Sequence, residues 1–556
     1  MNPAPVAIVL IRSLLSIVAA AGLPAAVEDE EVGSQTCNAC HPAIYRQYSA
    51  TSMFRSSGKL AEGPLLESFE RARFSDPALQ VDYRVSLSAE GYRLEFSRDS
   101  SGVRGERTLG WFVGSGRVAR SYVSALEGFL FQAPVSYYTG SAKWEPSPGF
   151  EQHPFLHLTR AVSSKCLQCH ASRLQPLAGT ENRFRMPPFL EGGVSCERCH
   201  GPGKSHVARM VAGDRQGPNG IINPAKLEPA RRDSVCAQCH LTGAARVPRA
   251  SAAGVGYRPG DLLSDYTAYF VWASAGSAVL SANSHFEKLR QSACQRAAAD
   301  GLWCASCHDP HGEPEAAKRV DYYRARCLQC HDSKLGSKPC RESLATRRTT
   351  QNDCIGCHMP KGRVRETEHA VFTDHSIPRR PPQPLGLPAS APSLASFWKG
   401  PVEERDLGLA YAMVAGEDPQ LRRRAYELLQ KAEARHAGDV PVLIHLAQFH
   451  EAAGREDQAM ALSERIVRLD PSQAAVAVNL GSYYMQRGRA QEALRLWNDA
   501  LSRNPALTSA RMNVAVAQYR AGNSSAAEET LRKALQYDPD HETARKLLAE
   551  IRAGGR

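Results

Sequence analysis

Two parts of the chain carry a regular pattern of hydrophobic and polar positions. In the first part, residues 81–98 alternate between the two kinds around a Glu90-Gly91 turn, in the run VDYRVSLSAEGYRLEFSR. A period of two is typical of a strand with one buried face, so this run predicts a β-hairpin. Residues 108–113 and 129–138 indicate further strands. We therefore expect a small β-rich insertion over about residues 75–150.

The second pattern repeats every 34 residues near the C-terminus. Prolines, glycines and alanines recur at this interval: Pro471, Pro505 and Pro539; Gly454, Gly488 and Gly522; Ala459, Ala493 and Ala527. The glycine would end one helix, the alanine would let a second helix pack closely against it, and the proline would close the unit. The spacing predicts an α-solenoid of helix pairs over residues 400–556 and resembles the tetratricopeptide repeat (TPR) family. An ordinary helical bundle is the alternative.

Fourteen of the sixteen cysteines lie in the motif Cys-x-x-Cys-His, which occurs seven times. Two thiols at this spacing can bond the two vinyl groups of one porphyrin, and the adjacent histidine then lies beneath the iron. A single copy could be a zinc site, but zinc would not require a histidine at the same offset in every copy. We therefore predict seven covalently attached haems c. The attachment residues are Cys37, Cys40, Cys166, Cys169, Cys196, Cys199, Cys236, Cys239, Cys304, Cys307, Cys327, Cys330, Cys354 and Cys357, and the proximal ligands are His41, His170, His200, His240, His308, His331 and His358.

The second axial ligand decides whether an iron only exchanges electrons or can also bind a substrate. Seven further histidines precede the repeats: His153, His157, His206, His285, His311, His369 and His375. We interpret most of them as distal ligands, with surface or propionate-binding histidines as the alternative. His311 follows His308 too closely to reach the far side of the same haem, so it should serve a neighbour. Met53 is an eighth candidate ligand, for the haem of His41; otherwise it is a core residue.

Three runs carry a resemblance to a known class of protein. They are CNACHPAIYRQYSATSM at residues 37–53, GVSCERCHGPGKSH at residues 193–206, and CASCHDPH together with CIGCHMP. They resemble multihaem cytochromes of the cytochrome c-552/c-554, hydroxylamine-oxidoreductase-like class. The whole chain resembles bacterial proteins that join such a module to TPR repeats. The resemblance implies a pattern of haem packing and electron-transfer chemistry, but no substrate. Relatives often have Ser-x-His where this chain has Ser52-Met53, which leaves the ligand of one haem open.

The predicted fold class is mainly α. A haem-dense segment cannot bury a conventional side-chain core, so the cytochrome domain should have little regular secondary structure beyond its small β-rich insertion. Six prolines then mark a linker: Pro378, Pro381, Pro382, Pro384, Pro388 and Pro392. The expected divisions are a signal peptide at residues 1–26, a seven-haem cytochrome c domain at 27–376, the linker at 377–399 and the TPR domain at 400–556. We expect the TPR domain to act as an independent docking module.

The N-terminus favours export, because residues 1–12 can serve as a positive region and residues 13–23 as an apolar region before a cleavage site. An uncleaved segment that associates with the membrane is the alternative. Cys294 and Cys340 fall outside the motifs, and in an oxidising compartment they should form a disulfide; two free thiols are the alternative. The net charge of +11 is offset by haem propionates, so we expect no nucleic-acid partner.

These features predict a periplasmic or extracellular electron-transfer protein whose TPR repeats dock a redox partner. The alternative is a multihaem oxidoreductase that acts on a small nitrogen or sulfur compound at one five-coordinate haem. Against this alternative, no motif has the form Cys-x-x-Cys-Lys, which resembles the catalytic haem site of nitrite reductases. A filament of stacked cytochromes is disfavoured by the attached repeats. We assign no catalytic residue.

Overall fold

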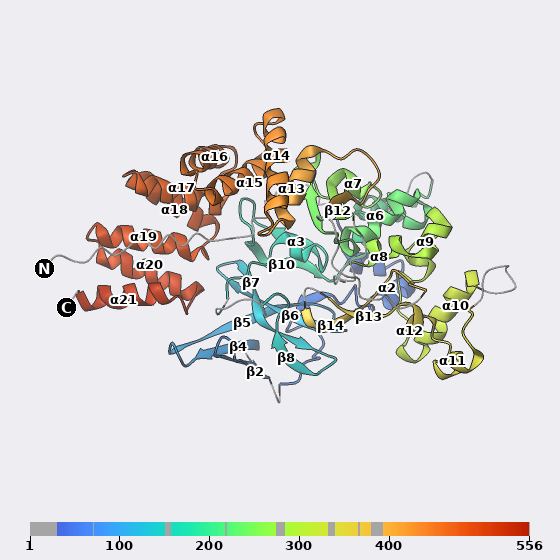
Figure 1. Cartoon of the computed structure of the whole chain (residues 1–556). Coiled ribbons are helices and arrows are strands. Elements are labelled where there is room, and N and C mark those ends of the chain that lie inside the picture. Colours follow the sequence, from blue (N-terminus) through green and yellow to red (C-terminus); the bar gives the residue numbers. More distant parts are fainter. Residues whose placement is uncertain are drawn as a thin grey trace.

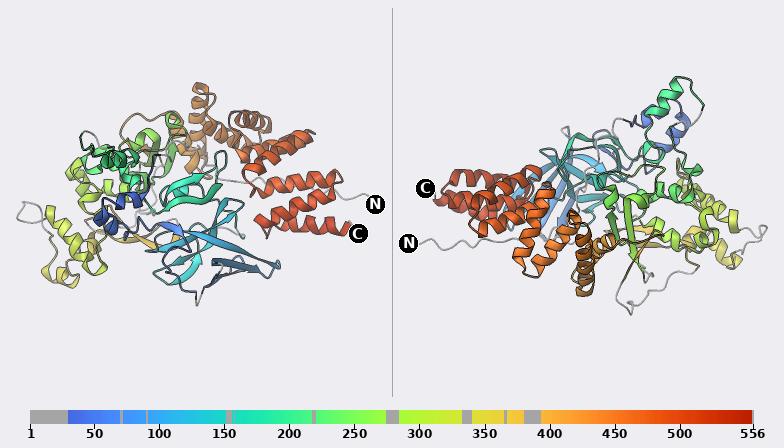
Figure 2. Two further views of the ribbon diagram at one scale, coloured as in Figure 1. Left: turned by 180° about the vertical axis from the view of Figure 1, so that it is seen from behind. Right: turned by 90° about the horizontal axis from the view of Figure 1, so that it is seen from above.

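The computed structural model describes residues 30–69, 72–89, 91–150, 156, 158–216, 220–273, 284–331, 340–364, 367–379 and 393–554. The expected signal peptide lies outside these residues. Three parts are visible in Figure 1: an antiparallel sheet, a group of short helices that carry the Cys-x-x-Cys-His motifs, and a row of helix pairs at the C-terminus. In both Figure 1 and Figure 2, the last helix pairs and the segment around the sixth and seventh motifs lie at opposite ends of the molecule.

Eight strands form the large antiparallel sheet in the order β2-β3-β4-β5-β6-β7-β8, with β1 paired to β5. The strands are β1 (Ser57–Lys59), β2 (Arg73–Asp76), β3 (Val81–Ser88), β4 (Gly91–Arg98), β5 (Val103–Val113), β6 (Ala119–Leu126), β7 (Phe129–Tyr138) and β8 (Lys143–Pro146). The predicted hairpin is confirmed, because β3 pairs with β4 and places Val85 opposite Leu94. From β2 to β8, each strand pairs with the next strand along the chain, so this part of the sheet is a meander.

The prediction of a mainly α fold with a small β-rich insertion is wrong. Helices make up 46% of the structure and strands 19%, and the sheet curls until β8 lies near β2. Residues 108–113 and 129–138, which the sequence indicated as strands, belong to β5 and β7. The strands that the sequence did not indicate are β1, β2, β6 and β8. Three of these have only three or four residues, and β6 buries the polar side chains of Arg120 and Ser124, so no clear pattern marks them.

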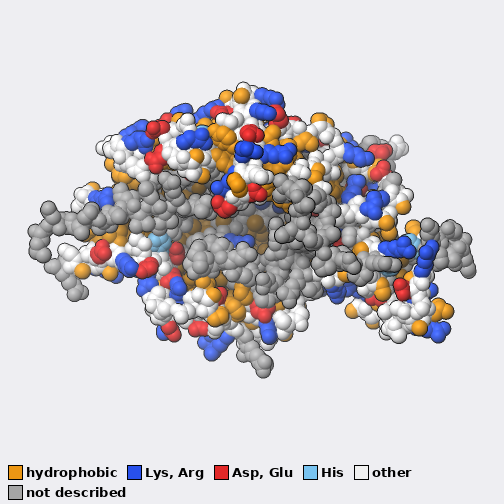
Figure 3. Space-filling model, in the orientation of Figure 1, with side chains coloured by type: hydrophobic (Ala, Val, Ile, Leu, Met, Phe, Trp, Pro, Cys, Tyr) orange, Lys and Arg blue, Asp and Glu red, His pale blue; other side chains and the backbone are white. Residues whose placement is uncertain are grey.

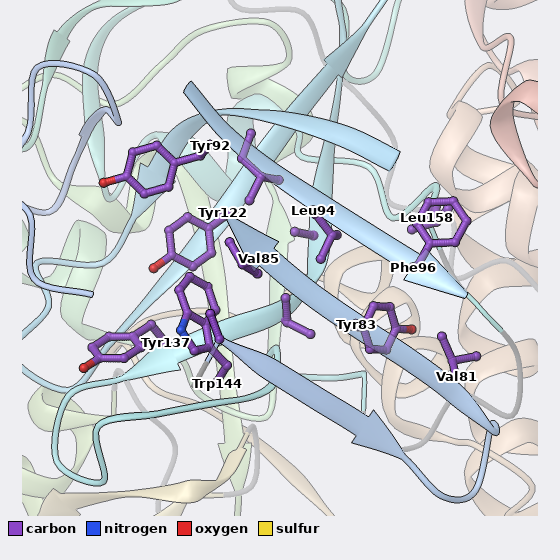
Figure 4. Packing of buried hydrophobic residues seen from close by; sticks show 14 of the residues in the cluster. Val81, Tyr83, Val85, Tyr92, Leu94, Phe96, Tyr122, Tyr137, Trp144 and Leu158 are labelled. Atoms are coloured by element: carbon purple, nitrogen blue, oxygen red, sulfur yellow. The ribbon is translucent and has the colours of Figure 1, made fainter. Parts of the chain in front are cut away.

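The sheet has a hydrophobic core of its own that needs no cofactor (Figure 4). Its members include Val81, Tyr83, Val85, Tyr92, Leu94, Phe96, Tyr122, Tyr137, Trp144 and Leu158. Beside the stacked rings of Tyr122 and Trp144, the carboxylate of Glu67 accepts a hydrogen bond from the Tyr122 hydroxyl at 2.8 Å and one from Arg120 at 3.2 Å. This buried group fixes the segment before β2 against the sheet.

Short helices carry most of the motifs, and three small sheets lie among these helices or pack against the repeats. The α-helices are α1 (Ser34–Asn38), α2 (Pro42–Tyr48), α3 (Ser164–Leu167), α4 (Glu197–His200), α5 (Lys204–Val211), α6 (Pro229–His240), α7 (Leu263–Tyr266), α8 (His285–Gln291), α9 (Ala293–Ala298), α10 (Arg319–His331), α11 (Leu344–Thr349) and α12 (Cys354–His358). The short 3-10 helices are η2 (Pro224–Lys226), η3 (Ala250–Ala252), η4 (Ala299–Gly301), η5 (Cys304–Ser306) and η6 (Ala316–Lys318). The strands are β9 (Ala171–Pro176) with β10 (Phe184–Gly192); β11 (Ala245–Pro248), β12 (Thr267–Trp272) and β15 (Leu394–Ser396); and β13 (Lys361–Val364) with β14 (Thr367–Thr373).

The predicted helix pairs are confirmed at the C-terminus. They are α13 (Glu404–Val414), α14 (Pro419–Arg435), α15 (Val440–Ala452), α16 (Glu456–Leu469), α17 (Ala474–Gln486), α18 (Ala490–Arg503), α19 (Thr508–Arg520) and α20 (Ser524–Tyr537), followed by α21 (Glu542–Gly554). The three repeated alanines are fully buried. Gly454, Gly488 and Gly522 have φ of +70°, +77° and +79°, a conformation that favours glycine at the end of a helix.

The helix pairs pack against the rest of the chain at two places. Near α13, the sheet β11-β12-β15 shares a core with the first repeat that includes Val247, Phe270 and Tyr411, and Arg249 pairs with the buried Asp406 at 2.8 Å. Near α20, Tyr537 packs against the large sheet. Strand β15 falls within the expected linker and pairs with β12. These contacts argue against an independently folding repeat domain.

The outer surface is mixed in charge. On the described residues of the face in Figure 3, basic and acidic side chains are interspersed over the repeats. Within the described ranges, no helix is both long and apolar enough to cross a membrane.

Candidate haem-binding site

One connected cavity of about 3650 Å³ receives side chains from all seven Cys-x-x-Cys-His motifs. Pockets for single small molecules reach roughly 1,000 Å³, so this space suits several large groups at once. The turns after β5 and β7 cover one side of the cavity with Arg117, Tyr138 and Ser141. The large sheet therefore forms a wall of the site and is not a detached insertion.

A helical turn explains how each motif presents its three functional side chains. In a helix, positions i, i+3 and i+4 share one face, and these are the positions of the two cysteines and the histidine. The His41 amide donates to the Cys37 carbonyl at 2.9 Å, and the His200 amide donates to the Cys196 carbonyl at 3.0 Å. The fifth motif repeats this at His308. Both thiols and the imidazole can therefore meet one haem.

The first and third motifs lie side by side although the large sheet separates them in sequence. The buried carboxylate of Glu197 accepts hydrogen bonds from the amides of Val32 and Gly33, both at 2.8 Å. The amide of Cys196 donates to the Ser34 hydroxyl at 3.1 Å. The Cys37 and Cys196 thiols also interact, and this interaction lowers the pKa of Cys196 to about 7. Glu197 thus ties the segment before the first motif to the third.

Arg198, inside the third motif, joins it to the second and fourth. Its guanidinium donates to the carbonyl of Gln168 at 2.9 Å and to the side-chain oxygen of Gln238 at 3.1 Å. The Gln238 amide group returns a hydrogen bond to the Arg198 carbonyl at 3.0 Å. The thiols of Cys169 and Cys239 also interact with each other. Three motifs therefore meet at one junction.

The fourth to seventh motifs follow one another in space. Thiol contacts join Cys236 to Cys304, and Cys327 to Cys354. Between these two contacts, the Tyr323 hydroxyl on α10 lies 3.2 Å from Nδ1 of His308. This tyrosine links the fifth motif to the helix that carries the sixth.

Three pairs of imidazoles from different segments face each other. The ring centroids of His200 and His311 are 5.9 Å apart with an interplanar angle of 7°, and those of His308 and His375 are 6.2 Å apart at 29°. A metal bonded at about 2 Å to one nitrogen of each of two imidazoles on its opposite sides places the centroids roughly 6 Å apart. These pairs therefore have room for one iron each.

The third pair joins His240 and His285, whose centroids are 5.2 Å apart at an interplanar angle of 86°, so these two rings would have to move apart by about 1 Å to hold an iron between them. His285 also touches His375, with centroids 4.6 Å apart, so the fourth and fifth motifs share a cluster of imidazoles. Burial lowers the pKa of His285 to about 2, aided by neighbouring His240 and His375, and burial lowers the pKa of His308 to about 4. The neutral ring is the form that binds iron, so this environment suits ligands.

Two other predicted ligands also line the cavity. Met53 lies where the first three motifs meet, because its carbonyl accepts from the Val194 amide at 3.0 Å and the Ser56 hydroxyl donates both to Met53 and to the His170 carbonyl. His206 lies on α5 and reaches the same cavity. His153 and His157 lie outside the described residues. His369 belongs to β14, and its side chain is outside the described part.

The cavity also contains residues that the sequence interpretation missed or misjudged. The predicted disulfide is absent, because Cys294 and Cys340 are both free thiols; Cys294 instead lies close to Cys330 of the sixth motif. Arg198 and Tyr323 were missed. A signal existed for Tyr323, since it precedes Cys327 by four residues and so shares its helix face.

The residues fit covalently bound haem on structural grounds. Cysteine thiols and imidazoles from all seven motifs line a space of suitable size for several haems. The fold and the site thus define a c-type cytochrome.

Comparison with protein families agrees with this class. Residues 145–201 match the family "Cytochrome c554 and c-prime", residues 296–336 match the "Doubled CXXCH motif", and residues 422–479 and 484–551 match "Tetratricopeptide repeat". The chain is a multihaem c-type cytochrome fused to TPR repeats. No curated protein matches it.

Among solved structures, the chain is similar to MamA proteins over part of its length. MamA AMB-1 is 27% identical and aligns over 27% of this chain and 86% of that chain, with a TM-score of 0.24. A MamA RS-1 double mutant is 14% identical and aligns over 28% of this chain and 86% of that chain, with a TM-score of 0.25. Likeness at this level carries no argument about function.

Proposed function

We propose that this protein holds seven haems and transfers electrons through them in the periplasm or at the cell surface. The observation that carries the proposal is the single cavity into which all seven motifs point. Haem iron with two protein ligands supplies one-electron exchange with little rearrangement. The paired thiols would anchor the haems, the facing imidazoles would supply their iron ligands, and the large sheet would cover one side of the site.

The contacts between motifs support an order for electron transfer. The first motif adjoins the third through Glu197, and the third adjoins the fourth through Arg198 and Gln238. The fourth to seventh motifs follow through the thiol contacts and Tyr323. The second motif contacts the third through Arg198 and Gln168, and the fourth through Cys169 and Cys239. The arrangement is a branched path in which the second, third and fourth motifs meet.

The TPR repeats would dock the redox partner. The repeats contain no haem motif, and their last helices lie far from α10–α12 (Figure 2). A photoreactive residue in place of Tyr519, which is 38% exposed on α19, should crosslink a partner protein. The same residue in place of Leu87, 47% exposed on β3, is the matched control. Equal crosslinking at both positions would contradict docking on the repeats.

Mass and spectroscopy test the main proposal. The mature protein from a host with full haem maturation should carry seven haem masses, and its oxidised form should be mainly low-spin. Fewer haem masses would contradict the number seven. Rapid carbon monoxide binding to the reduced protein would favour the oxidoreductase alternative, and the haem of His41 is the first to examine because Met53 stands where relatives often have histidine.

A further inference from the structure

The axial imidazoles differ in what their Nδ1 atoms contact. In the third motif, Nδ1 of His200 lies 2.7 Å from the Ile222 carbonyl. In the seventh motif, Nδ1 of His358 lies 3.1 Å from the Pro378 carbonyl. Nδ1 of His375 lies 3.0 Å from the Thr373 carbonyl. A carbonyl only accepts, so each of these rings donates from Nδ1 and leaves Nε2 free for iron.

The pair at the fourth motif is different. Nδ1 of His240 and Nδ1 of His285 are both buried, and neither has a hydrogen-bond partner within the part of the chain that the structure describes. In each of the other two facing pairs, at least one ring has an Nδ1 partner: Ile222 for His200, and Thr373 for His375.

This difference changes how well the rings support oxidised iron. An imidazole that donates from Nδ1 to an acceptor becomes more basic and stabilises the ferric state. Without an acceptor, the ring is a weaker electron donor and the ferrous state gains relative stability. Burial also raises the reduction potential, because it disfavours the more highly charged ferric state.

Charges of both signs lie around the fourth motif. The guanidinium of Arg198 lies at Gln238, between Cys236 and Cys239 in sequence. A positive charge near a haem opposes its oxidation. The nearest carboxylate on α6, Asp233, is paired with Arg232 at 3.1 Å and lies 3.8 Å from Arg290. Its negative charge is therefore largely compensated. The buried carboxylate of Glu287, which accepts a hydrogen bond from the Gly243 amide at 2.9 Å, opposes the effect of the Arg198 guanidinium.

From these contacts we infer that the haem held by His240 and His285 has a higher reduction potential than the haems held by the other two facing pairs. This inference rests on the proposed seven-haem function and extends it. The fourth motif is one of the three motifs that meet at the branch of the path. The haem held by His240 and His285 would thus be reduced before the haems held by the other two facing pairs.

The ring orientations supply a spectroscopic label for this haem. Parallel imidazole planes give a rhombic low-spin electron paramagnetic resonance spectrum, whereas perpendicular planes give a single large-gmax feature. The angle is 86° for His240 and His285 but 7° for His200 and His311. In the full-length holoprotein, the large-gmax feature should therefore report the fourth motif. His285→Gly should abolish that feature and leave the rhombic signal, which checks the assignment.

Stepwise reduction at controlled potential, followed by electron paramagnetic resonance, tests the inference. The large-gmax feature should disappear before the rhombic signal as the potential is lowered. Disappearance after the rhombic signal would overturn the inference while leaving the seven-haem proposal intact. Absence of both low-spin signals would overturn the proposed ligation itself.

A one-atom variant tests the physical cause. Tyr323 is the only described side chain that contacts Nδ1 of a proximal histidine, at His308. Tyr323→Phe removes this hydroxyl and should raise the midpoint potential of the haem at His308, whereas the midpoint of the large-gmax feature should not move. If no midpoint changes in the variant, hydrogen bonding at Nδ1 does not set the potentials and the inference fails.

Discussion

The hydroxyl of Tyr537 on α20 donates a hydrogen bond to the carboxylate of Glu127 at 2.9 Å. Glu127 occupies the turn between β6 and β7, so this bond joins the last helix pair of the repeats to the large sheet. The Tyr537 ring also packs edge-on against Phe131, with centroids 6.1 Å apart, and its side chain is 1% exposed. The protein is thus held together by contacts distant from its haem motifs.

The first prediction concerns this contact. Tyr537→Ala should lower the free energy of unfolding by about 3 kcal/mol, because it leaves a cavity beside Phe131 and an unpaired Glu127. Tyr537→Phe keeps the ring and should lose only about 1 kcal/mol. Denaturation followed by circular dichroism measures both. Equal losses in the two variants would show that the ring does not contribute to the contact.

Removal of residues 400–556 should destabilise the haem-binding part. The truncation would expose Val247 and Phe270, which share a core with the first repeat, and would leave Arg249 without Asp406. We expect aggregation or an altered haem spectrum in the truncated protein. A soluble truncation with the full-length visible spectrum would restore the hypothesis of an independent repeat module.

The buried ion pair in the large sheet should be important for stability. The side chains of Arg120 and Glu67 are 2% and 0% exposed, so Glu67→Ala would leave a buried cation unpaired and cost about 3 to 5 kcal/mol. The surface pair of Arg84 and Glu95 is the control, because its side chains are 56% and 44% exposed. Glu95→Ala should change the free energy of unfolding by less than about 1 kcal/mol. Similar losses in the two variants would contradict this account.

Stability should also depend on pH through Glu31. Burial, with the nearby Glu197, raises the pKa of Glu31 from 4.5 to about 7. A carboxyl that holds its proton more tightly when folded stabilises the folded state most below its unfolded pKa. This contribution should therefore be full below pH 4.5 and fall as the pH rises to about 7. Glu31→Gln should flatten this part of the pH profile measured by thermal unfolding; an unchanged profile would contradict the prediction.

The sequence predicted repeated local chemistry well and long-range geometry poorly. The helix pairs followed from glycines and alanines at a fixed spacing, because each repeat makes the same contacts with its neighbours. The size of the sheet did not follow, because β1, β2 and β8 are too short to show a pattern and β6 buries the polar residues Arg120 and Ser124. The position of the His200 ring opposite the His311 ring depends on how the loops fold, and no local sequence pattern predicts that. The disulfide between Cys294 and Cys340 was predicted only because these two cysteines lie outside the motifs. Their remaining unassigned says nothing about the distance between them in the folded chain.

The neighbouring positions of Ser34 and Cys196, 162 residues apart in sequence, have a consequence for biosynthesis. The segment before the first motif completes its hydrogen bonds only with the third, and the whole large sheet is synthesised between them. The segment before the first motif therefore cannot complete its hydrogen bonds until the third motif has been synthesised. The sheet, which has its own core, can fold before then. Closing so long a loop carries an entropic cost that a folded sheet reduces by bringing the two ends together. The sheet would then act as an internal template that must form before the first haem is enclosed.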